Sequence, residues 1–277
     1  MNSEAKIQAA DGAAGPCLLR ETRGAVALLT LNRPKARNSL SEELLLALDA
    51  ALAEISAAKS VHAVVIAGAP PAFCAGHDLR EVTARRADAD RGRAFFEHLM
   101  GLCSGLMQAI MSCPKPVIAA VNGVATAAGC QLVASCDLAV ASSEARFATP
   151  GVNIGLFCST PMVALSRNVG RKHAMEMLLT GDLIPAARAA EIGLVNKVVP
   201  PDKVLPAAFA LADAIAAKSP LTLKTGKEAF YRQIEMTVPD AYDYASRVMV
   251  ENMLRRDSEE GIGAFLDKRE PSWPDES

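Results

Sequence analysis

The pattern of apolar and polar positions changes once along the chain, at about residue 200. Before that point, short apolar runs of strand length alternate with longer segments in which apolar residues recur at helical spacing. The runs that predict strands lie at residues 17–22, 25–32, 63–67, 117–121, 138–141 and 194–199. After that point only helical patterns occur, at residues 204–217, 221–234, 240–255 and 259–268. This order predicts an α/β fold with a helical C-terminal region.

Three regions follow from this change of pattern. Residues 1–15 are small and polar, and we expect a flexible N-terminal tail there. Residues 16–200 form the predicted α/β core, which is long enough to bury a sizeable apolar interior. Residues 201–277 form the predicted C-terminal helical region.

The stretch from Lys115 to Asp137 is the most informative part of the core. An apolar run at 117–121 is followed by a bend of small residues at 122–128 and then by a second apolar run of helical character. Small residues let a ligand come close to the backbone. Amide N–H groups at a helix start face that space, and the helix dipole adds partial positive charge. The stretch therefore predicts one half of an oxyanion hole, which stabilises negative charge on a carbonyl oxygen.

Charge and cysteine content narrow the class of protein. The formal net charge is -2, without the basic excess of nucleic-acid-binding proteins. The seven cysteines are an odd, scattered set without CxxC or Cys/His metal spacing, which favours reduced thiols over disulfides or a metal site. No apolar run reaches membrane-spanning length, and the polar start lacks a signal-peptide pattern. We therefore expect a cytoplasmic protein that binds no nucleic acid, membrane or metal.

Four ordered segments resemble one enzyme family. They are FCAGHDL at 73–79, KPVIAAVNG to SCD at 115–137, FATPGVNIGLF at 147–157 and TGDLIPAARAAEIGLVNKVVP at 180–200. Their order and spacing are similar to the crotonase superfamily, the enoyl-CoA hydratase/isomerase group, over about residues 17–270. The fuller pattern, with GHDL and GCQLVASCD, resembles one subgroup of that family.

The resemblance implies a fold, a ligand and a common chemistry. The fold is a spiral of ββα turns whose C-terminal helices support a homotrimer, often as a dimer of trimers. The ligand is an acyl-CoA thioester, with coenzyme A as part of the substrate and no separate cofactor, and the chain has no GxGxxG or GxxxxGK[ST] motif. By motif position, the backbone N–H groups of His77 and Ala128 form the oxyanion hole. Polarising the thioester carbonyl there stabilises an enolate.

The sequence departs from the family at the two positions that carry acid/base catalysis. Hydratases of this family use two glutamates, one ionised and one protonated, to activate water and deliver a proton. The matching positions here are Gln131 and Gly151, and neither residue can hold or pass a proton near neutral pH. The sequence therefore keeps the hole and puts ordinary hydratase activity in doubt.

Further positions match substrate-binding segments of the family. The residues that we expect to bind substrate are Lys35, Ala36, Arg37, Ala75, Gly76, Asp78, Leu79, Gly129, Cys158, Ser159, Phe265 and Lys268. The first three and the last two match segments that reach CoA, and Cys158 and Ser159 match the wall of the acyl pocket. Exposed charge, capping and ordinary packing remain alternatives for these residues. The same holds for the imidazole ring of His77, which is also a candidate proton donor.

Three functions remain open from the sequence. The first is an acyl-CoA enzyme of the hydratase/isomerase type, a lyase or isomerase of fatty acyl-CoA metabolism. The second is a decarboxylase or thioesterase that uses His77 or the segment 158–160. The third is an acyl-CoA binder without catalysis.

Overall fold

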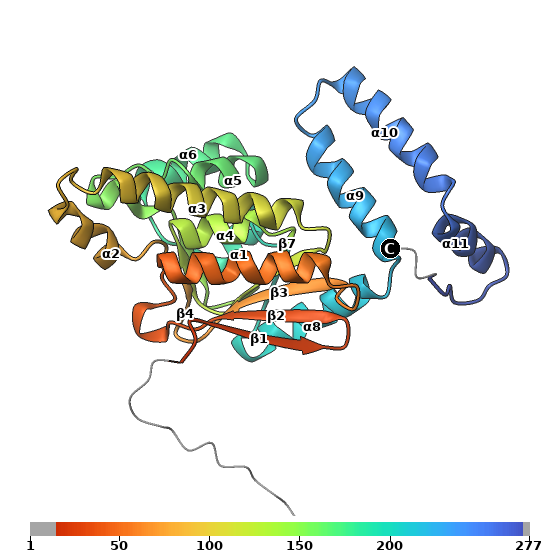
Figure 1. Ribbon diagram of the computed structural model, residues 1–277, viewed down its shortest axis with the longest axis horizontal. Coiled ribbons are helices and arrows are strands. Elements are labelled where there is room, and N and C mark those ends of the chain that lie inside the picture. The colour runs from red at the N-terminus through yellow and green to blue at the C-terminus, as the bar shows by residue number, and fades with distance from the viewer. Residues whose placement is uncertain (1–14, 274–277) are drawn as a thin grey trace, which may run out of the picture.

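The computed structural model describes residues 15–273 (Figure 1). Its larger sheet has six strands in the order β1-β2-β3-β5-β7-β10. Their bounds are β1 Leu18–Arg23, β2 Val26–Leu31, β3 Ala63–Gly68, β5 Val117–Val121, β7 Leu138–Ser142 and β10 Lys197–Val199. The first two strands form an antiparallel hairpin, whose turn contains Gly24 at φ +57°. All the other neighbours in this sheet are parallel.

A smaller sheet of four short strands has the order β4-β6-β8-β9. Its strands are β4 Ala72–Cys74, β6 Val124–Thr126, β8 Arg146–Ala148 and β9 Ile184–Pro185. The first three are parallel, and β9 is antiparallel to β8. Sequence analysis did not predict this sheet, because strands of two or three residues are too short to show a period-two pattern.

The chain repeats one path three times through the two sheets. A strand of the larger sheet leads to a strand of the smaller sheet and then to helices that cover them. The helices of the three turns are α2 Leu79–Ala84 with α3 Arg93–Ser112, then α4 Ala128–Ser135, and then α5 Pro161–Asn168 with α6 Arg171–Thr180. This path is the ββα spiral that the resemblance implies, so the predicted α/β fold is confirmed.

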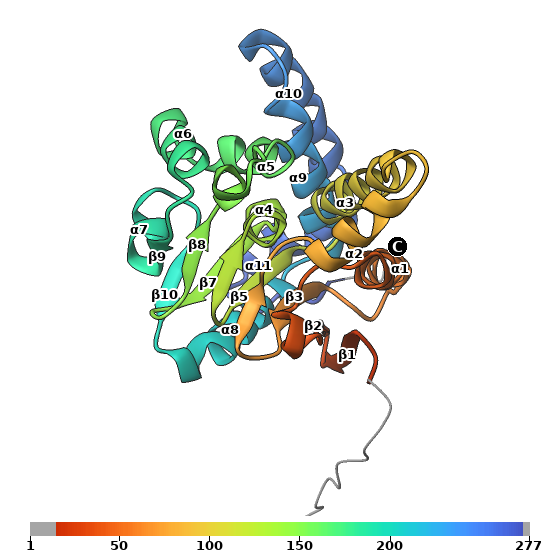
Figure 2. The same cartoon turned by 90° about the vertical axis from the view of Figure 1, so that its left-hand side faces the viewer.

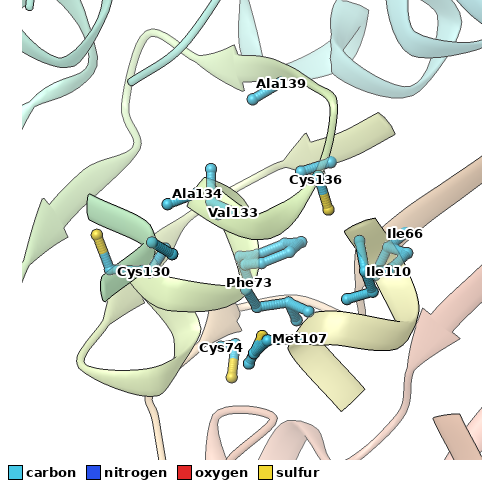
Figure 3. Close-up of a cluster of buried hydrophobic side chains, with 14 of the residues drawn as sticks. Ile66, Phe73, Cys74, Met107, Ile110, Cys130, Val133, Ala134, Cys136 and Ala139 are labelled. Carbon is cyan, nitrogen blue, oxygen red and sulfur yellow. The ribbon is translucent and has the colours of Figure 1, made fainter. Parts of the chain in front are cut away.

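Helices cover both faces of the larger sheet. On one face lie α3, α4 and α1 (Glu42–Ala57), which begins where the Ser41 hydroxyl accepts a hydrogen bond from the Leu44 amide. The main apolar core lies beneath them, and Figure 3 shows the ring of Phe73 in it among side chains of α3 and α4. On the other face α8 (Val204–Ala216) packs against β2, β3, β5 and β7 and forms a second, smaller core. Short helices complete the fold: α7 Ala186–Glu191 and the 3-10 turns Pro34–Ala36, Arg85–Ala87, Pro150–Ile154 and Pro201–Lys203.

The last three helices extend from one end of the body (Figures 1 and 2). They are α9 Pro220–Gln233, α10 Val238–Met253 and α11 Arg256–Leu266. Neither α9 nor α10 has a buried residue. This agrees with the predicted all-helical end of the chain, and the boundaries of the other predicted elements differ from the observed ones by a few residues. The predicted tail at 1–15 lies, apart from Gly15, outside the described residues.

Candidate active site

Two segments far apart in sequence meet at the end of the smaller sheet. Strand β4 runs into residues 75–78, and strand β6 runs into the start of α4. A Cβ atom placed on Gly76 would lie 2.9 Å from Ala127 Cβ and 3.3 Å from the Ala128 nitrogen. The structure therefore brings together the two segments in which the sequence placed the donors of the oxyanion hole.

Hydrogen bonds to Leu40 fix the direction of the His77 amide. The Leu40 N–H donates to Gly76 O over 2.7 Å, and the Asp78 N–H donates to Leu40 O over 3.1 Å. Gly76 O and the His77 N–H belong to one trans peptide and point in opposite directions, so the His77 N–H points away from Leu40. The Thr126 hydroxyl donates to Ala75 O over 3.1 Å. This bond joins the segment at 75–78 to the end of β6, just before α4.

The start of α4 is held in an unusual backbone conformation. Ala127, which precedes the helix, has φ +51° and ψ -119°, and its N–H donates to Ala148 O over 2.9 Å. Ala128 is the first helical residue, so its N–H has no acceptor within the helix. Gly129 packs so closely on β4 that a Cβ there would lie 2.1 Å from Cys74 O. This contact requires glycine and sets the distance between α4 and residues 75–78.

The imidazole ring of His77 lies inside the protein. Both of its ring nitrogens are buried, and among the described residues neither has a hydrogen-bond partner. Burial lowers the pKa of this histidine. The ring is therefore neutral at pH 7, with one nitrogen that can donate a hydrogen bond and one that can accept.

The two positions of the missing glutamates are filled differently. Gln131 on α4 is 4% exposed, and its Oε1 atom is buried without a partner among the described residues. At Gly151, a Cβ would lie 2.6 Å from Leu156 O and 2.9 Å from Cys158 Sγ. The Gly151 N–H donates to that sulfur over 3.3 Å. The thiol of Cys158 and its own loop therefore occupy the space where a side chain at position 151 would begin.

Two polar residues that have a buried oxygen without a partner among the described residues were not predicted from the sequence. Thr149 is fully buried, and its hydroxyl has no partner among the described residues. It follows Ala148, whose carbonyl accepts the Ala127 N–H at the start of α4. Asn122 leaves its Oδ1 unpaired in the same way and donates from Nδ2 to Gly68 O. A single buried threonine or asparagine has no sequence signal, because its neighbours come from other turns of the spiral.

Five of the remaining predicted binding residues lie in or beside the two segments that meet. Ala75, Gly76 and Gly129 line the meeting point of the two segments, and Leu79 begins α2 beside them with 51% of its surface exposed. Asp78 points instead to Arg33, with which it forms a 2.8 Å ion pair.

Other predicted residues lie on the surface or far from the hole. Lys35 and Arg37 are exposed, and Arg37 O accepts the Ala75 N–H, so this turn lies next to the site. Ala36 lies between them and is half-buried, and Ser159 is exposed on its loop. Helix α11 lies at the opposite end of the molecule from α2 (Figure 1); Phe265, 82% exposed, is on this helix, and Lys268 follows its end. Within one chain these two residues do not reach the predicted oxyanion hole, and their role stays a prediction.

Cysteines and acidic residues do not form a metal centre in the part of the chain that the structure describes. All seven cysteines are free. Burial raises the pKa of Cys74, Cys103 and Cys130 to about 12 each, and it raises the pKa of Cys158 as well. At neutral pH the predicted site residues His77, Gln131 and Cys158 therefore carry a neutral imidazole, an amide and a protonated thiol.

Comparison with known proteins identifies the family. A family model described as enoyl-CoA hydratase/isomerase matches residues 21–276. The chain therefore belongs to the enoyl-CoA hydratase/isomerase family. Within it, the chain is similar to the rat enoyl-CoA hydratase domain-containing protein 3, mitochondrial, with 44% identity over 245 residues, which are 88% of this chain and 80% of the relative.

Solved structures agree with this assignment. A crystal structure of an enoyl-CoA hydratase from Mycobacterium smegmatis has a TM-score of 0.88 and 50% identity, covering 93% of this chain and 99% of that one. The human enoyl-CoA hydratase domain-containing protein 3 has a TM-score of 0.88 and 44% identity, covering 93% and 100% of the two chains. The crotonase fold and the subgroup indicated by the motifs are thereby confirmed.

The comparison corrects the predicted location of the protein. The names of the rat, mouse and human relatives describe them as mitochondrial. The predicted cytoplasmic location is therefore wrong by this comparison. Its basis, free cysteines without disulfide spacing, indicates a reducing environment and does not distinguish between compartments.

Among residues 15–273, no single helix has the length and apolar content of a membrane span. The helices at 201–216 and 220–233, which are bent relative to each other, have that length and apolar content only when they are taken together.

Proposed function

We propose that this protein binds an acyl-CoA thioester and polarises its carbonyl oxygen between the N–H groups of His77 and Ala128. The observation that carries the proposal is the close approach of Gly76 to the start of α4, 3.3 Å from a Cβ on Gly76 to the Ala128 nitrogen. Two N–H groups that converge on one point suit an oxygen that gains negative charge. Each such donor contributes roughly 10²–10³-fold to rate when that charge develops in the transition state.

The chemistry that follows is stabilisation of an enolate. Polarisation withdraws electrons from the thioester carbonyl, so a bond at the neighbouring carbon breaks more readily and leaves its electron pair in the enolate. Preorganised backbone donors act without reorganisation at the moment of reaction. The N-terminal end of α4 adds partial positive charge at the same place.

Acid/base catalysis by a carboxylate pair is not part of the proposal. Gln131 and Gly151 stand at the two positions, and the loop with Cys158 fills the space beside Gly151. A neutral site favours a second candidate function, decarboxylation of a malonyl-type thioester. Such a substrate carries its own leaving carboxylate, which departs as carbon dioxide and leaves the electron pair in the enolate. The enolate then takes a proton, for which the buried ring of His77 and the thiol of Cys158 are candidate donors.

Contacts to the CoA part complete the proposal. The exposed Lys35 and Arg37 lie on the turn that hydrogen bonds to Ala75, and their charges suit phosphate groups.

We also propose that the protein is a homotrimer, alone or as a dimer of trimers. Exposed apolar side chains on α9, α10 and α11 support self-association. A neighbouring copy would then supply Phe265 and Lys268, which do not reach the hole of their own chain.

The test compares two ligands that differ only in the carbonyl oxygen. Butyryl-CoA has the thioester carbonyl, and S-butyl-CoA is the matching thioether without it. We expect calorimetry to show at least tenfold tighter binding of butyryl-CoA, and the carbonyl carbon-13 resonance to shift downfield on binding. Equal affinity for both ligands without a shift would contradict the proposed oxyanion hole.

Measurements of turnover distinguish the three candidate functions. Crotonyl-CoA and malonyl-CoA are offered to the purified protein in parallel, and products are separated by chromatography. We expect slow or no hydration of crotonyl-CoA, since the carboxylate pair is missing. Release of carbon dioxide and acetyl-CoA from malonyl-CoA would favour the decarboxylase, and binding without either product would favour an acyl-CoA binder.

A further inference from the structure

We propose that Arg33 and Asp78 form a positioning pair that fixes the His77 N–H in the oxyanion hole. This inference rests on the proposed function, and it assigns a role to two residues that do not touch the thioester. Arg33 lies 45 residues before Asp78 in the chain. The two side chains join the turn at 33–40 to the segment 75–80.

The carboxylate of Asp78 is fully engaged next to His77. Its Oδ2 atom accepts hydrogen bonds from Arg33 Nη2 over 2.8 Å and from the Ser39 hydroxyl over 3.3 Å. Its Oδ1 atom accepts the Arg80 N–H over 3.1 Å and so caps α2. The Asp78 side chain is 11% exposed and the Arg33 side chain 24% exposed, so solvent screens the pair only in part.

Arg33 is fixed from its other side as well. Its Nη1 atom donates to Ser39 O over 2.6 Å and lies 3.1 Å from the Ser39 hydroxyl. Its backbone N–H donates to Asn38 Oδ1 over 2.9 Å. The buried Asn38 also donates to Ala69 O and Ala72 O, each over 2.7 Å, just before and within β4. The guanidinium is therefore held by one turn and presents Nη2 to the carboxylate.

These contacts surround His77 in the chain. Leu40, directly after Ser39, holds the Gly76 carbonyl and the Asp78 amide on either side of His77. The ion pair adds a third attachment, from a side chain, at the residue after His77. The bond at Gly76 O holds the peptide plane that contains the His77 N–H, and the bonds at Asp78 hold the next plane, so the His77 N–H keeps its direction without a ligand. Donors that are already aligned stabilise a developing oxyanion most effectively.

The pair has an electrostatic effect in the same direction. Burial raises the pKa of Asp78, but hydrogen bonds from Arg33, the Arg80 amide and Ser39 outweigh it and leave this pKa lowered. The carboxylate is therefore ionised at neutral pH, one residue from a donor that must stabilise negative charge. The guanidinium compensates this charge. Without it, an unpaired carboxylate would oppose the oxyanion.

The test uses butyryl-CoA and S-butyl-CoA with Arg33→Met, Asp78→Asn and the double variant. For Arg33→Met we expect the preference for the thioester to fall roughly tenfold or more, the carbonyl carbon-13 shift to shrink, and S-butyl-CoA affinity to stay within twofold. Asp78→Asn keeps an oxygen for the Arg80 N–H, so its preference for the thioester should fall less than that of Arg33→Met. Because both side chains act through one contact, the double variant should lose no more than the worse single variant. Arg33→Lys should be intermediate, since one ammonium cannot reach both Asp78 and Ser39 O as the fork does.

Arg20→Met is the matched control. It removes an exposed arginine that pairs with Glu54 over 2.7 Å on the outer surface, and we expect its ligand preference to equal that of the native protein. Circular dichroism and thermal unfolding check that each variant is folded. If Arg33→Met does not fold, the positioning role is tested with Asp78→Asn alone, by comparing its affinities for butyryl-CoA and S-butyl-CoA with those of the native protein.

The outcomes separate this inference from the proposed function. If the native protein does not prefer the thioester, the proposed function fails. If the native protein prefers it and folded Arg33→Met keeps both the preference and the carbon-13 shift, only the positioning role is overturned. Equal loss of both ligands also overturns it, since that result means a role in CoA binding. Losses that multiply in the double variant show two independent effects and contradict a coupled pair.

Discussion

Gly151 shows how a single residue restricts the chemistry of the site. Its backbone lies against Leu156 O and Cys158 Sγ, both within 3 Å of where a Cβ would be. Backbone atoms cannot move aside as the end of a flexible side chain can. A side chain at this position would therefore require the loop at 151–158 to change shape, and substitution of the residue alone is not enough to restore a carboxylate.

We expect Gly151→Ala to destabilise the protein by about 1–3 kcal/mol, the usual cost of overpacking a filled site. Gly105→Ala is the matched control: Gly105 lies within α3 with nothing near its Cβ position, and alanine there should stabilise by up to about 1 kcal/mol. Urea unfolding measures both. A neutral or stabilising Gly151→Ala would show that the loop can rearrange easily.

The buried ring of His77 predicts a dependence of stability on pH. Burial lowers its folded pKa, whereas in the unfolded chain the pKa is about 6.5. Below about pH 6.5 the unfolded chain takes up a proton that the folded protein does not, so the contribution present above that pH is lost as pH falls toward the folded pKa. Urea unfolding of the native protein should therefore show a larger loss between pH 7.5 and pH 5.5 than His77→Gln. Equal losses would mean that the ring titrates as in the unfolded chain.

At the scale of elements, polar side-chain contacts hold α9 against the body of the protein. It has no buried apolar residue. Lys227 donates from Nζ to Asp137 Oδ2 over 2.6 Å, to Ile110 O over 2.9 Å and to Lys115 O over 3.1 Å. The Tyr231 hydroxyl donates to Asp137 Oδ1 over 2.9 Å. Asp137 ends the sequence motif at 115–137, and in the structure it anchors the C-terminal helices.

We expect Lys227→Met to destabilise the protein by about 3–5 kcal/mol, because the Lys227 side chain is 8% exposed and its loss leaves Asp137 without the ammonium. Hydrogen exchange should increase in α9 and α10 more than in α4. Lys224→Met, an exposed lysine on the same helix, should have little effect. If both variants behave alike, the ion pair does not hold α9.

At the scale of the whole molecule, the extended C-terminal helices expose apolar side chains. Tyr242, Met249 and Met253 on α10 are each more than half exposed, and Phe265 and Leu266 on α11 are 82% and 72% exposed. Exposed apolar surface of this extent is typical of an interface. These exposed side chains therefore support the proposed homotrimer.

We expect light scattering to show a trimer or a multiple of it for the native protein, and Met249→Glu with Met253→Glu to shift it to the monomer by placing charge in the apolar interface. If the role of Phe265 and Lys268 comes from a neighbouring copy, this variant should also bind S-butyl-CoA more weakly. Lys224→Met serves again as the control. A monomeric native protein would contradict both the trimer and the contribution of a neighbour.

Periodicity predicted the order of most elements because their patterns are local. The helix at 42–58 and its cap at Ser41, the buried strand at 117–121 and the helices after residue 200 each depend on residues close in sequence. The smaller sheet could not be predicted, since its strands have two or three residues. The pair of Asp78 with Arg33 is a contact across 45 residues that no local pattern contains, and the role of Asp78 in substrate binding stays a prediction.

The sequence by itself determined the α/β order, the family motifs and the absence of both carboxylates, since these are properties of residue type and spacing. The tertiary structure decided what meets in space. It placed Gly76 beside Ala128, buried the ring of His77, filled the space at Gly151 with the loop of Cys158, and joined Arg33 to Asp78. The physical reason is that the chain forms these contacts between different turns of the spiral, where packing of the whole core sets distance and direction.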